Sequence, residues 1–186
     1  MEHVRAHGYP VPAARAINET DIIMDRLEGP TMLDDLGRRP WRIDRHAATL
    51  ADLHRRLHAI HAPPGLLAPL GEGDSLLHLD LHPDNVMLTP GGPFVIDWPN
   101  VARGSGDADV AHTWIVLACS TPTSGAYRQA LSRIGRSFFL RSFLRRFDRP
   151  AIVAQIEAAG TYRLANRTVP QSERDAIRRT LDELRP

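Results

Sequence analysis

The chain has 186 residues, a formal net charge of +1 and a single cysteine, Cys119. This length supports one domain with a sizeable core, and the near-neutral charge does not call for a nucleic-acid partner. A lone cysteine excludes an internal disulfide and fits a reducing cytosol, and the lack of a long apolar run or a leader-like start predicts a cytoplasmic protein without a membrane partner.

The first predicted elements are a hairpin and a helix. Residues 13–28 predict the hairpin, with its turn at residues 18–20. Between Arg42 and His61 the apolar side chains recur at three- and four-residue spacing, which predicts an amphipathic helix. A linker that contains three glycines follows this helix and leads into a polar loop.

A second hairpin is predicted directly after the polar loop. The apolar runs Val86–Leu88 and Phe94–Ile96 are typical of short strands, and residues 89–93 between them are rich in glycine and proline. Pairing of the two strands would bring Asn85 and Asp97 together at the open end of the hairpin, where they could share a metal ion.

Helices are predicted for most of the remaining chain. Residues 107–119 predict a buried helix, and residues 124–147 predict one long helix or a broken pair. Two more helices are expected at 150–160 and 171–184. The predicted fold class is therefore α+β, mostly helical with small β-hairpins.

The polar loop carries the strongest functional signal. It reads His78-Leu-Asp-Leu-His-Pro-Asp-Asn85, and the apolar run after it ends in Asp97 and Trp98. Kinase-type phosphoryl transfer needs one carboxylate to orient or deprotonate the acceptor hydroxyl, and an amide and a second carboxylate to hold Mg²⁺ on the phosphates. Asp80, Asn85 and Asp97 offer these groups in that order.

This segment resembles the aminoglycoside phosphotransferase and choline kinase-like family, the small-molecule branch of the protein-kinase fold. The family pattern reads roughly H-G-D-L-H-x-x-N, followed by a hydrophobic run that ends in I-D-W. The resemblance implies that Asp80 is the catalytic base and that Asn85 and Asp97 are Mg²⁺ ligands. It also implies ATP or another nucleoside triphosphate as the phosphate donor.

A further stretch from Gly104 to Ala111 resembles the family's G-D-P-x-x-D-L-A. The resemblance implies that Asp109, together with His78, supports the catalytic loop and does not react. The chain departs from the family pattern where Leu79 replaces the usual glycine before the base. We expect this leucine to shift the backbone near the base, because glycine tolerates conformations that leucine does not.

The start of the chain resembles the family's link between its two lobes. Residues 7–12 are similar to the stretch between the regulatory helix and the fourth strand, and residues 21–29 are similar to the late strand and the hinge. The resemblance implies that the nucleotide binds against hinge residues Met24, Asp25, Arg26 and Leu27.

By the same resemblance, residues 1–28 would be a remnant of the small lobe and the hinge. Residues 29–186 would form a protein-kinase-like large (C-terminal) lobe, with the catalytic loop at 78–98. The sequence contains no lysine and no G-x-G-x-x-G before this loop, so a truncated N-terminal lobe is expected. A hairpin without its sheet is marginal in water, and we expect residues 1–30 to mediate a homo-oligomer or to require a partner.

The function implied is an ATP- and Mg²⁺-dependent phosphotransferase that moves the γ-phosphate to a hydroxyl of a small molecule, either an aminoglycoside-like antibiotic or a metabolite. Two alternatives stay open. One is a truncated, catalytically inactive remnant or binding module, and the other is half of a split enzyme that another chain completes. The sequence selects neither the acceptor nor ATP over GTP.

Three histidines, His54, His58 and His61, recur at helical spacing, and histidines four apart on a helix can bind zinc. We find no carboxylate or cysteine cluster to complete such a site, and therefore predict surface and core-edge histidines. The arginines between 128 and 149 predict a solvated helix face. Acids on the C-terminal helices, such as Glu157, could meet a cationic acceptor.

Overall fold

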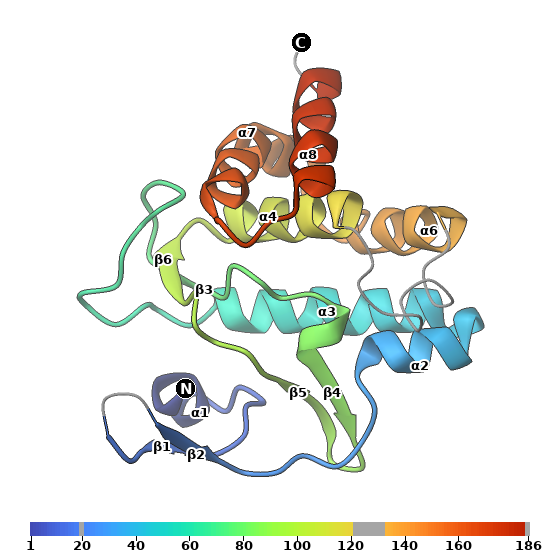
Figure 1. The fold of residues 1–186 in the computed structure, drawn as a ribbon. Coiled ribbons are helices and arrows are strands. Elements are labelled where there is room, and N and C mark those ends of the chain that lie inside the picture. Colours follow the sequence, from blue (N-terminus) through green and yellow to red (C-terminus); the bar gives the residue numbers. More distant parts are fainter. Residues whose placement is uncertain (19–20, 121–132, 185–186) are drawn as a thin grey trace.

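The computed structural model describes residues 1–18, 21–120 and 133–184, and Figure 1 shows how they are arranged. Helix α4 (Gly106–Cys119) lies at the centre, and eleven of its 14 residues are buried. A helix that is apolar on all sides must be covered on all sides. Helices α6 (Arg133–Leu144), α7 (Arg149–Ala165) and α8 (Gln171–Leu184) pack against it from the C-terminal half of the chain.

Helix α3 (Ile43–His58) runs below α4 and packs mainly against α6 (Figure 1). Its apolar side chains follow the predicted periodicity, since Ala47, Leu50, Leu53 and Leu57 are fully buried. The predicted helix end at residue 61 is wrong by three residues. The Ile60 N–H turns back to the Leu57 carbonyl at 3.0 Å, which closes the last turn early.

The second predicted hairpin is confirmed, with different strand bounds. Strands β4 (Val86–Thr89) and β5 (Gly92–Val95) pair antiparallel, and Val86 lies opposite Val95. Because β5 begins at Gly92, the turn shrinks to two residues, a proline and a glycine. Before this hairpin, Thr31 caps helix α2 (Met32–Arg38) by accepting the Asp34 N–H at 3.0 Å.

A third strand pair was not predicted. Strand β3 (Ser75–Leu77) precedes the predicted catalytic loop and strand β6 (Ala102–Gly104) follows it. The two strands pair antiparallel, with Leu77 opposite Ala102. Gly73 is required beside this pair, because a Cβ atom there would lie 2.2 Å from the Gly104 carbonyl carbon. The segment between the two strands, which contains Asp80, Asn85 and Asp97, therefore begins and ends at the same strand pair.

The N-terminal segment is joined to the rest of the core. Helix α1 (Glu2–Ala6) was not predicted, but strands β1 (Ala14–Ala16) and β2 (Ile22–Met24) form the predicted antiparallel hairpin. Buried Val4, Tyr9 and Val11 belong to the main hydrophobic cluster. The Val95 N–H donates to the Pro10 carbonyl at 2.8 Å, which ties this segment to strand β5.

The C-terminal helices begin and end close to the predicted residues, with α7 extending to Ala165. Residues 121–132, at the start of the predicted 124–147 helix, lie outside the described ranges. Helix α6 follows them. In the described part of the chain, no helix is long and apolar enough to cross a membrane.

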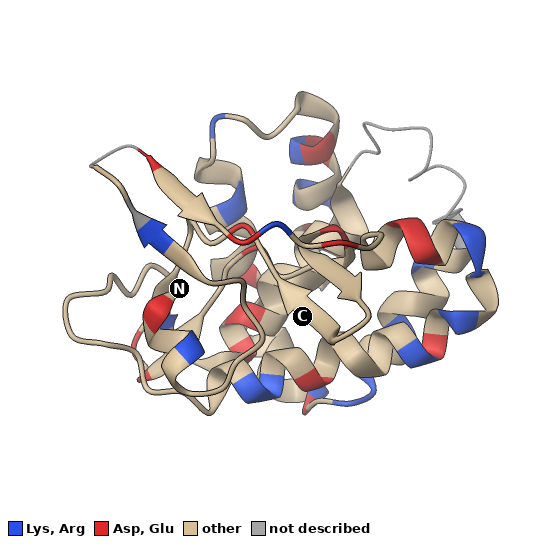
Figure 2. Ribbon diagram, turned by 90° about the horizontal axis from the view of Figure 1, so that it is seen from below, with Lys and Arg blue, Asp and Glu red and all other residues tan. Residues whose placement is uncertain are grey.

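Arginines in the turn after α6 and at the start of α7 contact other parts of the protein. Arg145 and Arg146 lie 2.5 Å and 3.1 Å from a carboxylate oxygen of Asp44 on α3, and the Arg149 guanidinium lies over the Trp114 ring. Figure 2 shows basic and acidic segments interspersed along these helices. The arginine row is therefore both solvent-facing and paired.

The hairpin β1–β2 leaves large apolar side chains in solvent. Ile17, Ile22 and Ile23 are 60%, 61% and 47% exposed. We expect the 186-residue chain to self-associate through this hairpin, because exposed apolar side chains and unpaired strand edges attract a second copy. Light scattering across a dilution series should show a mass that rises with concentration.

A double substitution, Ile22→Thr with Ile23→Thr, should return the chain to a monomer while retaining strand propensity. Leu67→Thr is the matched control, since Leu67 is 79% exposed in a loop elsewhere. A wild-type chain that stays monomeric at all concentrations, or a loss of association in the control alone, would contradict this expectation.

Candidate active site

The catalytic loop starts where β3 ends and is held by one buried carboxylate. Asp109, in the first turn of α4, accepts the Leu79 N–H at 2.8 Å through Oδ1 and the His78 N–H at 3.3 Å through Oδ2. Its side chain is fully buried. These contacts are those of a residue that fixes the loop, with no access to a substrate.

Leu79 itself has a left-handed backbone, with φ of 56°. For a residue other than glycine this conformation costs roughly 1–2 kcal/mol. The N–H bond to Asp109 offsets part of this cost, and so does the packing of the buried side chain against Leu70, Leu77 and Ala102. The leucine thus adopts a conformation that glycine tolerates more easily, at the position next to Asp80.

Asp80 and Asn85 are in direct contact. The Asn85 side-chain nitrogen donates to the Asp80 carbonyl at 2.9 Å and to Asp80 Oδ2 at 3.3 Å, and it lies 3.4 Å from His82 Nε2. All three contacts use the amide nitrogen. The amide oxygen of Asn85 is therefore the atom left to bind a ligand.

The other carboxylate oxygen of Asp80, Oδ1, is buried and has no hydrogen-bond partner within the described chain. His82 Nε2 and Arg163 Nη1 each lie 3.6 Å from it, beyond hydrogen-bond distance. Burial raises the pKa of Asp80, but His82 and then Arg163 more than offset this, so the pKa lies below its ordinary value. Asp80 is consequently ionised at neutral pH, and its carboxylate is able to accept a proton.

Asp97 lies at the end of strand β5, where it is exposed and has a φ of 64°. The Ile96 N–H donates to the Asn85 carbonyl at 3.0 Å, so the hairpin brings Asn85 and Asp97 to the same open end. Within the described ranges the Asp97 carboxylate makes no hydrogen bond. An amide oxygen and a free carboxylate are hard oxygen donors, and this donor set fits Mg²⁺.

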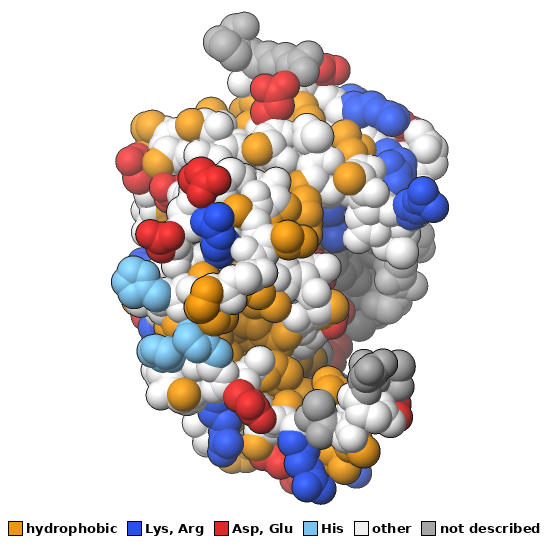
Figure 3. Space-filling model, turned by 90° about the vertical axis from the view of Figure 1, so that its left-hand side faces the viewer, with side chains coloured by type: hydrophobic (Ala, Val, Ile, Leu, Met, Phe, Trp, Pro, Cys, Tyr) orange, Lys and Arg blue, Asp and Glu red, His pale blue; other side chains and the backbone are white. Residues whose placement is uncertain are grey.

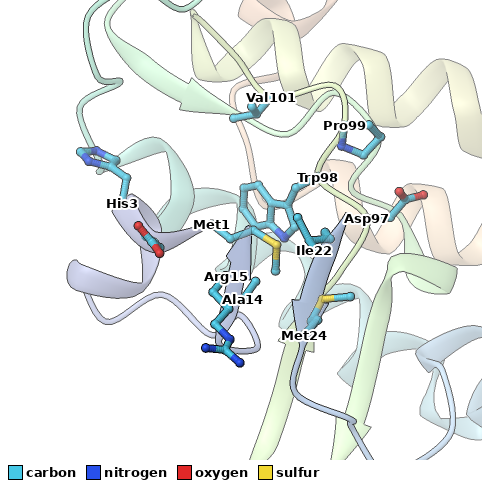
Figure 4. Close-up of a pocket in the computed structure, with 11 residues that line it drawn as sticks. Met1, His3, Ala14, Arg15, Ile22, Met24, Asp97, Trp98, Pro99 and Val101 are labelled. Atoms are coloured by element: carbon cyan, nitrogen blue, oxygen red, sulfur yellow. The ribbon is translucent and has the colours of Figure 1, made fainter. Parts of the chain in front are cut away.

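A cavity of about 680 Å³ opens beside Asp97. Ile22, Met24, Trp98 and Val101 supply its apolar walls, and Asp97 lies at one edge. Figure 3 shows hydrophobic side chains gathered in a hollow on this face, and Figure 4 shows the Asp97 carboxylate pointing away from Trp98. A largely apolar cleft with a few polar groups at its rim suits a flat heteroaromatic ring.

The structure brings only one of the four predicted hinge residues to this cavity. Met24 lines it, whereas Asp25 and Arg26 are exposed and Leu27 is half-buried; these three are not among the described residues of its wall. The chain leaves β2 at Met24 and turns away toward α2. Trp98, which follows the candidate metal ligand, also lines the cavity and was not predicted in that role.

The histidine cluster requires a correction. No carboxylate was predicted near His54 and His58, but Asp109 lies beside both in the folded chain. His58 Nε2 is 2.9 Å and His54 Nδ1 is 3.6 Å from Asp109 Oδ2. The three groups could geometrically surround a cation. However, the Asp109 oxygens already accept two backbone N–H groups, so the cluster serves to hold the loop. His61 lies apart, and its carbonyl contacts His3.

This setting determines the charge of the cluster. Burial raises the pKa of Asp109, but the adjacent imidazoles of His54 and His58 hold it well below its usual range. Burial in turn lowers the pKa of His54. Asp109 is thus an ionised carboxylate inside the core, and it stays so only because N–H groups surround it.

Arg163 is the functional candidate that sequence reasoning missed. It lies on α7, far along the chain from the catalytic loop, and approaches Asp80 through the packing of α7 on α4. No local pattern marks it, since it is one arginine among 23 basic residues.

Comparison with known proteins gives a family match for part of the chain and a fold for nearly all of it. A model of the phosphotransferase enzyme family matches residues 65–151, which include Asp80, Asn85, Asp97 and Asp109. A search of curated proteins finds no match.

Two solved structures are similar. One is an apo thermostable mutant of the aminoglycoside phosphotransferase APH(4)-Ia, with 16% identity and a TM-score of 0.60. The other is an aminoglycoside-3'-phosphotransferase of type VIII, with 17% identity and a TM-score of 0.50. Each match covers 98% of this chain and 76% of the other. The fold is therefore α+β and kinase-like, as predicted.

Proposed function

We propose that this chain, whose residues 65–151 match the model of the phosphotransferase enzyme family, is a kinase-type enzyme that transfers the γ-phosphate of ATP to a hydroxyl of a small molecule, with Mg²⁺. The observation that carries this proposal is the grouping of Asp80, Asn85 and Asp97. The loop that holds the first two is fixed by Asp109, and the hairpin sets the third beside them.

Each residue has a defined task in this proposal. Asp80 orients the acceptor hydroxyl and accepts its proton as the oxygen bonds to phosphorus and the bond to the nucleoside diphosphate breaks. Asn85 and Asp97 would hold Mg²⁺, which neutralises charge on the phosphates. The apolar cavity with Trp98 and Met24 would bind the nucleotide base. Positioning of the reactants supplies most of the rate.

One observation favours a second candidate, a binding module that transfers no phosphate. The 186 residues contain no lysine, whereas the kinase fold normally anchors the α- and β-phosphates with a strand lysine. Arginine is no simple replacement, because its planar fork differs from an ammonium group in shape and hydration. In this candidate the pair Asn85 and Asp97 binds metal without turnover.

Phosphorus NMR separates the two candidates. With Mg²⁺-ATP and a panel of hydroxyl compounds, the enzyme should release ADP only when an acceptor is present and should form a new phosphate-ester signal. The binding module would produce neither. ADP release that is independent of every acceptor would count against transfer.

The metal site has its own test. Calorimetry should show that Mg²⁺ raises ATP affinity by about tenfold, equivalent to about 1.4 kcal/mol, and that Asp97→Ala removes this gain. Without a phosphate-anchoring lysine, we expect the affinity of this chain to stay weaker than micromolar. Asp84→Ala is the matched control, an exposed loop carboxylate near Asn85. An unchanged Mg²⁺ effect in Asp97→Ala would remove Asp97 from the site.

A further inference from the structure

A second cavity, of about 280 Å³, lies between the catalytic loop and helix α7. Leu79, the residue before Asp80, forms one wall, and Arg163 of α7 joins the cavity to the Asp80 carboxylate at 3.6 Å. The remaining polar lining comes from Asn100, His112, Tyr162 and Asn166. A small molecule in this space would lie beside the candidate base.

Arg163 is the charged residue among the described residues that line this cavity, and it lies near two carboxylates outside the lining, Asp80 and Glu173. Its Nε donates to Glu173 at 2.9 Å, and Glu173 is buried on α8 behind it. This hydrogen bond uses one edge of the planar guanidinium and holds the group in place. The planar fork has five N–H donors in all, so further donors remain for a ligand. None of the described residues that line the cavity is a carboxylate.

The other polar groups of the wall are neutral at pH 7. His112 is fully buried against the Tyr162 ring, and burial lowers its pKa to about 4. Burial also raises the pKa of Tyr162, which keeps its hydroxyl protonated. Glu157, the acid that might have met a cationic acceptor, is exposed on α7 and does not line this cavity.

We infer that this cavity is the acceptor subsite and that it binds a hydroxyl compound bearing an anionic oxygen group, a carboxylate or a phosphate, with Arg163 as the positioning residue. The inference deepens the proposed function and rests on it. A guanidinium forms paired, charge-assisted hydrogen bonds with both kinds of oxyanion. A polyamine would place like charge against Arg163 and would find no carboxylate in the described wall.

A matched set of three-carbon probes tests this by binding alone. D-glycerate and glycerol 3-phosphate carry the two oxyanions, glycerol is neutral, and 3-amino-1,2-propanediol is cationic. We follow the NMR shifts of the Leu79 methyl groups and of the Asn100 and Asn166 side-chain amides as each probe is added. These shifts should saturate at an about tenfold lower concentration of an anionic probe than of glycerol or the aminodiol. The better anion tells which group the site prefers. Tighter binding of the aminodiol, or no shift with any probe, would overturn the inference.

Variants locate the effect. Arg163→Gln should remove the anion preference. This substitution also leaves Glu173 buried without its partner, so a second variant, Asn166→Asp, is needed. The new carboxylate can still accept the hydrogen bonds from the Thr168 N–H and hydroxyl, at 3.0 Å and 2.8 Å. It also adds a negative charge to the cavity wall. Asn166→Asp should weaken the binding of the anionic probes about tenfold and leave the binding of glycerol unchanged. Arg178→Gln, an exposed arginine on α8, is the control. Anion binding as tight as in the wild-type chain, in both Arg163→Gln and Asn166→Asp, would refute the role of Arg163.

The inference and the proposed function fail separately. Anion binding that depends on Arg163, without acceptor-dependent ADP release for any compound, would remove the phosphotransferase proposal and leave an anion site. Acceptor-dependent ADP release with a preference for the aminodiol would keep the phosphotransferase and remove the anionic acceptor.

Discussion

Asp80→Asn should lower the turnover of any active form of this protein by about 10²–10⁴-fold, the range that a positioned base contributes. The substitution removes the charge and the proton-accepting capacity but retains the shape of the side chain. The Asn85 bond to the backbone carbonyl of residue 80, at 2.9 Å, does not involve the altered group. Folding should therefore be preserved.

Turnover with the best acceptor and the circular dichroism melting curve, measured on the same preparation, check this expectation. Asp84→Asn provides the control, because Asp84 is exposed on the same loop and, in the described part of the chain, its side chain makes no hydrogen bond or ion pair with Asp80. Turnover near the wild-type value in Asp80→Asn would exclude Asp80 as the base. A collapse of the melting curve would instead make it a structural residue.

Asp109→Ala should destabilise the fold by about 3–5 kcal/mol, the cost of removing one partner from a buried charged pair. The change leaves the N–H groups of Leu79 and His78, and the His58 imidazole, without their acceptor inside the core. Each buried group that loses its partner carries a desolvation cost. Turnover should fall as well, because the loop that presents Asp80 loses its support.

The pH dependence of this loss follows from the pKa of Asp109, which lies well below its ordinary value in the folded state. A depressed pKa adds stability above the unfolded-state pKa, and this stability is lost as the pH falls through the folded-state value. The difference in unfolding free energy between wild type and Asp109→Ala should therefore be full at neutral pH and shrink in acid.

Denaturant unfolding at pH 7 and at the lowest pH where both proteins fold measures this difference. Asp107→Ala is the control on the same helix; it lies in the first turn of α4, where an acid contributes about 0.3–1 kcal/mol through the helix dipole. An unchanged free energy of unfolding at pH 7 in Asp109→Ala would refute the supporting role.

The parts of the fold that sequence predicted are those set by neighbours along the chain. Helix α3 follows from apolar spacing, and β4–β5 follows from two apolar runs around a proline–glycine turn. That hairpin alone sets Asn85 beside Asp97. The grouping of the candidate site was thus accessible because its members lie within one short, locally ordered segment.

The parts that were missed depend on contacts between distant segments. Strands β3 and β6 are three residues each, too short to be recognised by alternation, and they pair across the whole catalytic segment. Arg163 reaches Asp80 only through the docking of α7, and Asp109 reaches His58 only through the packing of α4 on α3. The spacing of apolar residues along the sequence carries no information on contacts between such distant segments.

The β3–β6 pair also has a consequence for how this protein can vary. Because Leu77 and Ala102 lie opposite each other, the residues between them form an excursion from the fold, a long loop whose two ends are held together by the strand pair. The tip of that excursion, the Pro90–Gly91 turn, lies at the far end of the hairpin from Asn85 and Asp97. Lengthening a surface turn costs little chain entropy. Relatives can therefore gain or lose residues at this tip, and a tag or reporter could be inserted there, without displacing the groups at the other end.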